Sequence, residues 1–227
     1  GATNLAPFSF FNVVSPHPPI VGFSCGPRGD NFEQALGEEK DTLMNIRAGR
    51  EFVVNIVPEC MIDEMARSSD PLDHGESEFD HTGLAAAPST VVRPPRVQGV
   101  PVALECRLYD ILDVGVNVWI MGTVVHMHVD PACYLGSQGK QQHRVNLLAR
   151  TELRPVGRLD RANFGRLREI ESLDTRFAPS GPGVLDASEA HVRFASVCSA
   201  VYHDDAGGNL LRVLHGPVQT VGMNGRG

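Results

Sequence analysis

Hydrophobic positions along the chain fall in short runs that partly alternate with polar ones, a pattern typical of β-strands. Residues 13–24 contain two such runs around a Pro-rich turn, and further runs over 51–57, 102–108 and 116–129 are rich in Val, Ile, Leu and Phe. The last two runs are joined by a short turn that contains Gly115, so they predict an antiparallel hairpin. Strands that follow one another with short connections favour an antiparallel sheet over repeated βαβ units.

Helical patterns are few and short. The first is predicted to begin with Asp41 or Thr42 as its N-cap and to end with Gly49 as its C-cap. A second helix is predicted over residues 58–66, and a shorter helical turn over residues 77–81. The fold class is therefore mainly β or α+β, as a β-barrel with peripheral helices.

Composition excludes several classes of protein. The 227 residues are 42% hydrophobic with a formal net charge of −7, which excludes a long disordered chain and argues against nucleic acid as a partner. No apolar run approaches the roughly 20 residues that span a bilayer, so we expect no membrane partner. Five scattered cysteines without a C-x-x-C pair, and a first segment unlike a signal peptide, predict reduced thiols in a cytoplasmic protein.

One short motif resembles that of a serine hydrolase. Gly22, Ser24 and Gly26 match the G-x-S-x-G pattern of a nucleophile elbow. Such an elbow turns from a strand directly into a helix, whereas residues 26–39 predict a loop, and few residues precede Ser24. We therefore do not expect a hydrolase triad.

Two histidines lie two positions apart in the last predicted strand. His126 and His128 should face the same side of it, with Asp130 and Cys133 close by in sequence. A zinc site needs three or four well-placed ligands, and the sequence identifies no third one. We therefore interpret the two histidines as the polar face of a strand and expect no metal.

The start of the first predicted helix has the composition of an anion site. Lys40, Asp41 and Thr42 bring a cation, a carboxylate and a hydroxyl to a helix N-terminus, where backbone N–H groups and the helix dipole favour phosphate. An ordinary cap with a solvated lysine explains the same residues. Lysine is otherwise found only at Lys140, which singles Lys40 out in a chain whose other basic residues are arginines.

The segment over residues 4–15 combines aromatic and small polar side chains. Its phenylalanines are typical core residues, whereas its polar side chains suit hydrogen bonds to a planar ring. The two groups are Phe8, Phe10 and Phe11, and Ser9, Asn12 and Ser15.

Taken together, these segments resemble the flavin reductase-like, FMN-binding split-barrel family. The matches follow the family's order over about three quarters of the chain, which makes the resemblance specific. The matching segments are residues 4–19, 40–46, 51–57, 77–79, 88–89, 94–97, 101–106, 122–129 and 154–159.

The resemblance implies a six-stranded antiparallel split barrel that forms a homodimer with FMN near the subunit interface. By the same resemblance, one group of residues lines the flavin ring, a second holds the phosphate and ribityl chain, and one histidine lies near the nicotinamide. These are, in turn, Ser9, Phe10, Phe11 and Asn12; Ser24, Lys40, Asp41 and Thr42; and His128.

The activity that the resemblance implies is hydride transfer from NAD(P)H to FMN, with the reduced flavin passed to a partner monooxygenase. The chemistry would be the cofactor's, and the protein would supply placement and exclusion of water. The alternative is a non-catalytic, flavoredoxin-like FMN-binding protein that carries electrons. No dinucleotide fingerprint is present, so the sequence does not choose between NADH and NADPH.

We divide the chain into an FMN-binding split-barrel domain over residues 1–178 and a linker with a C-terminal extension over 179–227. The extension contains a predicted β-hairpin around residues 204–208. The family has a strand before the position of Gly1, so one barrel strand is expected to be missing. We expect the C-terminal hairpin to pack on the edge that this leaves open.

Overall fold

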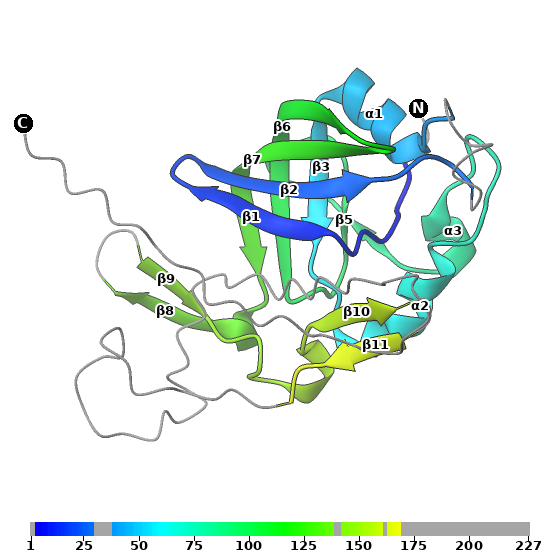
Figure 1. Ribbon diagram of the computed structural model, residues 1–227. Coiled ribbons are helices and arrows are strands. Elements are labelled where there is room, and N and C mark those ends of the chain that lie inside the picture. Colours follow the sequence, from blue (N-terminus) through cyan, green and yellow to red (C-terminus); the bar gives the residue numbers. More distant parts are fainter. Residues whose placement is uncertain (1–2, 30–37, 139–141, 161–162, 169–227) are drawn as a thin grey trace, which may run out of the picture.

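A five-stranded antiparallel sheet forms the centre of the protein, with strand order β1-β2-β7-β6-β3 (Figure 1). The computed structural model describes residues 3–29, 38–138, 142–160 and 163–168. The strands of the sheet are β1 (Phe11–Pro16), β2 (Pro19–Cys25), β3 (Glu51–Asn55), β6 (Val102–Val114) and β7 (Asn117–Val129).

Short helices and two-stranded ribbons surround this sheet (Figure 1). The helices are α1 (Asp41–Gly49), α2 (Ile62–Arg67) and α3 (Glu78–Thr82), with 3₁₀ turns η1 (Glu59–Met61), η2 (Pro131–Cys133) and η3 (Thr151–Leu153). The ribbons pair β4 (Ala86–Ala87) with β5 (Arg96–Val97), β8 (Tyr134–Gln138) with β9 (Gln142–Val145), and β10 (Val156–Asp160) with β11 (Asn163–Arg166). In Figure 1, α1 lies at one end of the sheet and the β10–β11 ribbon lies beside α2 at the other.

The predicted class is confirmed: the protein is mainly β with peripheral helices, in a split-barrel fold. Within the described ranges the central sheet has five strands rather than the expected six, with β1 and β3 at its two edges. Residues 179–227, including the predicted C-terminal hairpin, lie outside the described residues.

The predicted hairpin is the longest feature of the sheet. Strands β6 and β7 have 13 residues each and pair from Val102–Val129 to Val114–Asn117. Gly115 closes the turn with a φ of 60°, a left-handed conformation that glycine adopts without strain. Two register shifts, after Glu105 and after Leu108, mark β-bulges that bend the hairpin and increase its twist.

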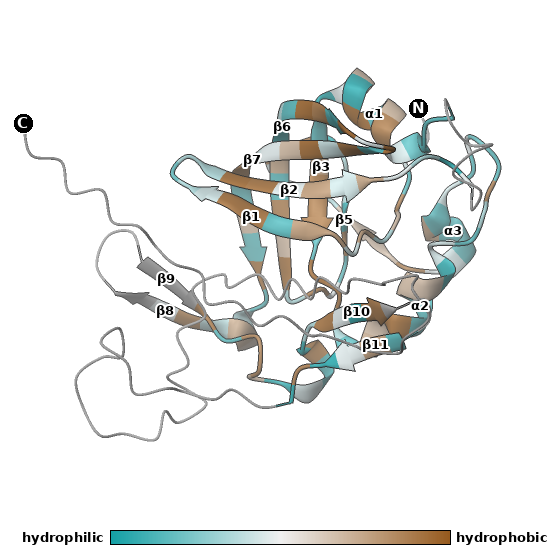
Figure 2. Cartoon of the chain, in the orientation of Figure 1, coloured by the Kyte–Doolittle hydropathy of each residue, from teal (hydrophilic) through white to brown (hydrophobic). Residues whose placement is uncertain are grey.

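The core is formed mainly by buried residues of the sheet strands and of α1. Its centre is a row of rings in which Phe8 and Phe23 have centroids 4.6 Å apart, and Phe23 and Phe52 have centroids 5.6 Å apart. Gly122 of β7 lies against this row, because a Cβ at that position would be 2.4 Å from Cζ of Phe52. Hydrophobic residues run along the strands, while the connections near α3 are largely hydrophilic (Figure 2).

Helix α1 forms where predicted, but both predicted caps are wrong. Lys40 is the N-cap, and Arg50 is the C-cap in a left-handed conformation (φ 61°) that donates its N–H to the Ile46 carbonyl. The side chains of Asp41 and Thr42 are engaged elsewhere, with Arg28 and Asn4, so neither caps the helix. Gly49 is the last helical residue rather than the C-cap.

Two further boundaries differ from the prediction. The strand expected over residues 51–57 ends at Asn55, because Val57 leaves the ladder with β6 and accepts a hydrogen bond from the Val156 N–H. The helix expected over residues 58–66 begins as the 3₁₀ turn η1 and becomes α-helical only at Ile62. A proline at the start of this segment is compatible with both forms.

The G-x-S-x-G motif is not a nucleophile elbow. Ser24 lies within β2, opposite Trp119 of β7, and its N–H donates to the Phe10 carbonyl at 2.9 Å. The chain continues from β2 into a loop, and no helix follows directly. The serine therefore lacks the strained strand-to-helix turn that exposes a hydrolase nucleophile.

Across the described part of the chain, no helix combines the length and the apolar character needed to cross a bilayer.

Candidate functional site: a cavity beside the start of helix α1

A cavity of about 1290 Å³ lies between the two edge strands of the sheet, β1 and β3. Its apolar wall includes Phe8, Phe23 and Phe52, so it opens onto the interior of the barrel. Its polar lining includes Asn4, Ser9, Thr42, Asn45, Glu51 and Asn55. This volume is larger than that of ordinary small-molecule sites, which is about 300–1,000 Å³.

Three of the predicted site residues line this cavity: Ser9, Phe11 and Thr42. The other six do not: Phe10, Asn12, Ser24, Lys40, Asp41 and His128. The predicted residues are therefore distributed over the cavity, the start of α1 and the far end of β7.

A chain of amides ties the N-terminal segment to α1. Nδ2 of Asn4 donates to Oγ1 of Thr42 at 2.6 Å, and Nδ2 of Asn45 donates to Oδ1 of Asn4 at 2.9 Å. The segment is held from its other side by Glu78, whose carboxylate accepts the Leu5 N–H at 2.7 Å. Asn4 and Asn45 were not predicted as site residues. In the sequence, the i, i+3 spacing of Thr42 and Asn45 indicates that they share one face of the helix.

The carboxylate of Asp41 is held by two other side chains. Nη1 of Arg28 lies 3.0 Å from Oδ2, and Nδ1 of His74 lies 2.5 Å from Oδ1. Arg28 also donates to the Leu72 carbonyl, so it joins three segments of the chain. The Arg28 guanidinium offsets the negative charge of Asp41 at the helix start, where that charge would otherwise disfavour an anion.

Lys40 lies close to the end of β2. Burial raises the pKa of the Cys25 thiol to about 11, while the nearby Lys40 ammonium acts in the opposite direction and Glu39 reinforces the rise. The Lys40 ammonium therefore lies within electrostatic range of Cys25, the last residue of β2, as does the Glu39 carboxylate.

The carbonyl of Lys40 accepts the N–H groups of Leu43 and Met44. The N–H groups of Asp41 and Thr42 are then the ones without an acceptor within the helix. A cation, a hydroxyl-bearing residue and these two N–H groups therefore lie at the start of α1.

The segment predicted to line a flavin ring presents two faces. Phe11 packs against the core, whereas the Phe10 side chain is 58% exposed. Asn12 accepts the N–H of its neighbour Val13 with its own Oδ1 at 2.8 Å. Because side chains alternate along an extended chain, Phe11 faces inward while Phe10 and Asn12 face the other side.

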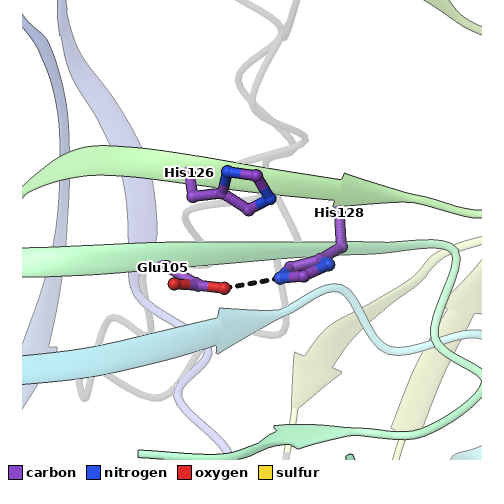
Figure 3. A group of neighbouring side chains, drawn as sticks. All are labelled: Glu105, His126 and His128. Carbon is purple, nitrogen blue, oxygen red and sulfur yellow. Dashed lines mark hydrogen bonds and ion pairs between the residues drawn. The ribbon is translucent and has the colours of Figure 1, made fainter. Parts of the chain in front are cut away.

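His128 lies at the far end of β7, against a buried glutamate (Figure 3). Its Nε2 is 2.5 Å from Oε1 of Glu105, whose side chain is 0% exposed. The same carboxylate accepts the N–H groups of Thr90, Val91 and Val92 at 2.6, 2.6 and 3.0 Å.

The environment of Glu105 keeps it ionised. Burial by itself raises its pKa, but the hydrogen bonds from the Thr90 N–H, the His128 ring and the Val91 and Val92 N–H groups outweigh that effect and lower the pKa to about 2. Glu105 was not predicted as a site residue. The signal for it was a single acidic residue inside the apolar run over residues 102–108.

Comparison with known proteins supports one family. The family described as flavin reductase like domain matches residues 1–142. An uncharacterised protein of Halalkalibacterium halodurans, BH2278, is 34% identical over 180 residues, which cover 77% of this chain and 79% of that protein.

Two solved structures extend this comparison. Nitrilotriacetate monooxygenase component B from Bacillus cereus is 28% identical, with a TM-score of 0.66 over 76% of this chain and 81% of that one. The 2-nitrobenzoate 2-nitroreductase NbaA of Pseudomonas fluorescens is 27% identical, with a TM-score of 0.61 over 79% of this chain and 81% of that one. Since the family matches well over half of the chain and a relative is 34% identical over 77% of it, this protein belongs to the flavin reductase-like family of split-barrel flavoproteins.

Proposed function

We propose that this protein is a flavin reductase that binds FMN and transfers a hydride to it from NAD(P)H. The observation that carries the proposal is that Lys40 is the N-cap of α1 and lies within electrostatic range of Cys25 at the end of β2. The chain as a whole has a net charge of −7, so binding of a phosphate-bearing cofactor depends on such a local cationic site.

The residues at the start of α1 fit the phosphate of FMN. In the proposal Lys40 and the N–H groups of the first turn of α1 bind the phosphate, while Ser24 and Thr42 supply hydroxyl groups toward it and the ribityl chain. Asp41 contributes to the proposed site by pairing with Arg28, which offsets the negative charge of Asp41 next to Lys40.

We place the flavin ring along the N-terminal segment. Ser9 and Asn12 would offer hydrogen bonds, and the exposed Phe10 would offer an apolar surface, while Phe11 anchors the segment in the core. Bound flavin supplies the hydride-accepting chemistry, and the protein binds, orients and shields it from water. His128 is proposed to contact the nicotinamide of NAD(P)H, with its Nε2 held by Glu105.

A homodimer forms part of this proposal. Ser9, Phe11 and Thr42 line the cavity, whereas His128 lies outside it. A single site that uses His128 together with the cavity residues would therefore need a contribution from a second copy of the chain. Large apolar side chains are exposed beside the N-terminal segment and on the β6–β7 hairpin, and they suit an interface with a second copy of the chain. They are Phe10, Val14, Tyr109, Leu112, Val114 and Val116.

A partner monooxygenase that receives reduced flavin is the third part of the proposal. It is supported by the likeness to component B of a nitrilotriacetate monooxygenase. We further propose residues 1–178 as the flavin-binding domain. We also propose a reducing, cytoplasmic location, which is supported by free thiols at Cys25, Cys60, Cys106 and Cys133.

The proposal is tested on the purified protein by its absorption spectrum and by NAD(P)H oxidation with added FMN. We expect flavin absorbance, or its appearance on adding FMN, together with catalytic oxidation of NADH or NADPH. Tight FMN binding with negligible oxidation would favour the alternative, a flavoredoxin-like electron carrier. Protein that neither binds FMN nor oxidises NAD(P)H would refute both.

The role of Lys40 gives a sharper test. Lys40→Ala is expected to weaken FMN binding by about 10- to 100-fold, because a charge-assisted hydrogen bond contributes about 1.5–3 kcal/mol. Only the backbone of Lys40 caps α1, and its side chain makes no capping bond, so the helix should be unaffected. Fluorescence quenching of FMN during titration measures the affinity, and circular dichroism checks the helix.

Lys140→Ala is the matched control, since it removes the other lysine and changes the net charge equally. It should leave the affinity for FMN unchanged. Equal affinities of wild type and Lys40→Ala would contradict a phosphate contact at Lys40.

A further inference from the structure

A cluster of three potential ligands lies outside the cavity and includes His128, the histidine proposed to contact the nicotinamide. Glu105 of β6 and His126 and His128 of β7 place their ligand atoms within 4.8 Å of one another (Figure 3). Within the described ranges, no other three His, Cys, Asp or Glu side chains converge in this way. From the sequence, the two histidines lacked a third ligand; the fold supplies one from the neighbouring strand.

The sheet geometry explains the convergence. Glu105 and His126 are direct cross-strand partners, and His128 is the diagonal neighbour two positions further along β7. Side chains in direct and diagonal positions share a face and lie within reach of each other. The bulge after Glu105 resets the register at this point, and the two imidazole rings stand 4.7 Å apart in an edge-to-face arrangement.

We propose that Glu105, His126 and His128 bind a divalent transition-metal cation of the zinc class. Two imidazoles and one carboxylate form a ligand set that zinc uses in three-ligand sites with an open fourth position. The carboxylate is fully buried, and three backbone N–H groups fix its orientation. Hydrogen bonds of this kind are typical of the outer shell that orients a ligating carboxylate.

Little rearrangement is required to close the site. Two ligand atoms on one zinc ion, each about 2.0–2.2 Å from it, lie about 3.3 Å apart. Nε2 of His128 and Oε1 of Glu105 are 2.5 Å apart, so the cation replaces the hydrogen bond between them and the two atoms separate by about 0.8 Å. The ligand atom of His126 lies within 4.8 Å of the other two, and its side chain is only partly buried, which leaves room for it to turn toward the cation.

The experiment uses untagged, full-length protein without added flavin, because a polyhistidine tag would itself bind zinc. After treatment with a chelator and its removal, zinc is titrated and the bound metal measured by atomic emission; cobalt replaces zinc for visible spectroscopy. We expect one equivalent per chain, a cobalt d–d spectrum, and a melting temperature that rises with zinc.

Two variants remove ligands and one serves as a matched control. His126→Ala and His128→Ala should weaken zinc binding by more than the roughly 10- to 100-fold that loss of an outer-shell partner costs. His81→Ala removes a histidine that also pairs with a carboxylate, that of Asp70 at 2.8 Å, but has no third ligand. It should bind zinc as the wild type does.

Absence of zinc binding in the wild type would overturn the proposal. The same conclusion would follow if His126→Ala retained wild-type affinity and the cobalt spectrum. Should His128→Ala fail to fold, His126→Ala decides the question, because its side chain makes no hydrogen bond to Glu105 that the fold depends on. None of these results depends on flavin binding, so failure here leaves the flavin reductase proposal untouched.

Discussion

Gly122→Val is expected to lower the free energy of unfolding by about 3 kcal/mol, at the upper end of the usual cost of overpacking a core. A Cβ at this position would lie 2.4 Å from Cζ of Phe52 and 3.0 Å from Cβ of Cys106. Phe52 is held in turn by the Phe23 ring, so it cannot withdraw freely. Urea denaturation followed by tryptophan fluorescence or circular dichroism measures the change.

The sign of the change in the free energy of unfolding distinguishes the effect of core packing from that of β-strand propensity. Valine favours strands more than glycine does, so β-propensity alone predicts stabilisation. The matched control is Gly157→Val in β10, where no atom lies within 4 Å of an added Cβ. We expect that variant to change stability by less than about 0.5 kcal/mol. Equal stability of Gly122→Val and wild type would show that the contact with Phe52 is not a constraint.

Glu105→Gln is expected to destabilise the fold by about 2–4 kcal/mol, because buried N–H donors lose a charged acceptor. The carboxylate accepts three consecutive backbone N–H groups and the His128 ring with its two oxygens. A glutamine amide nitrogen cannot accept, so donors on that side are left without an acceptor. Thermal and urea unfolding in the presence of chelator measure the loss without a contribution from metal.

Glu51→Gln is the matched control for this substitution. Glu51 also accepts a backbone N–H, that of Arg93 at 3.1 Å, but its side chain is 18% exposed and its ion pairs lie at the surface. We expect a change of less than about 1 kcal/mol there. If the two variants lost equal stability, burial of the Glu105 carboxylate would not explain its effect.

Helices and strands that depend on residues close to one another in the sequence were predictable from the sequence. The β6–β7 hairpin and helix α1 form where apolar spacing and turn residues placed them. Such patterns report which side of a segment is buried, because burial follows the period of the element. The boundaries were less predictable, as the caps of α1 show, since the side chains of Asp41 and Thr42 are claimed by residues distant in sequence.

The candidate sites were predictable only in part. Resemblance to a family indicated Lys40 and the N-terminal segment, but not Asn4, Arg28 or Glu105. Each of these acts through a contact between residues far apart in the chain, such as Asn4 with Thr42, 38 positions away, or Glu105 with His128, 23 positions away. No local period encodes such a contact.

By itself, then, the sequence determined the strands of the central sheet, the first helix and the resemblance to the flavin reductase-like family, because alternation and short motifs are local properties of the chain. The tertiary structure alone decided that a glutamate inside an apolar strand faces two histidines and three backbone N–H groups. It also decided that Asp41 is held by Arg28 and His74. The physical reason is that burial of a charge is tolerated only where distant segments bring it partners, and only folding brings those segments together.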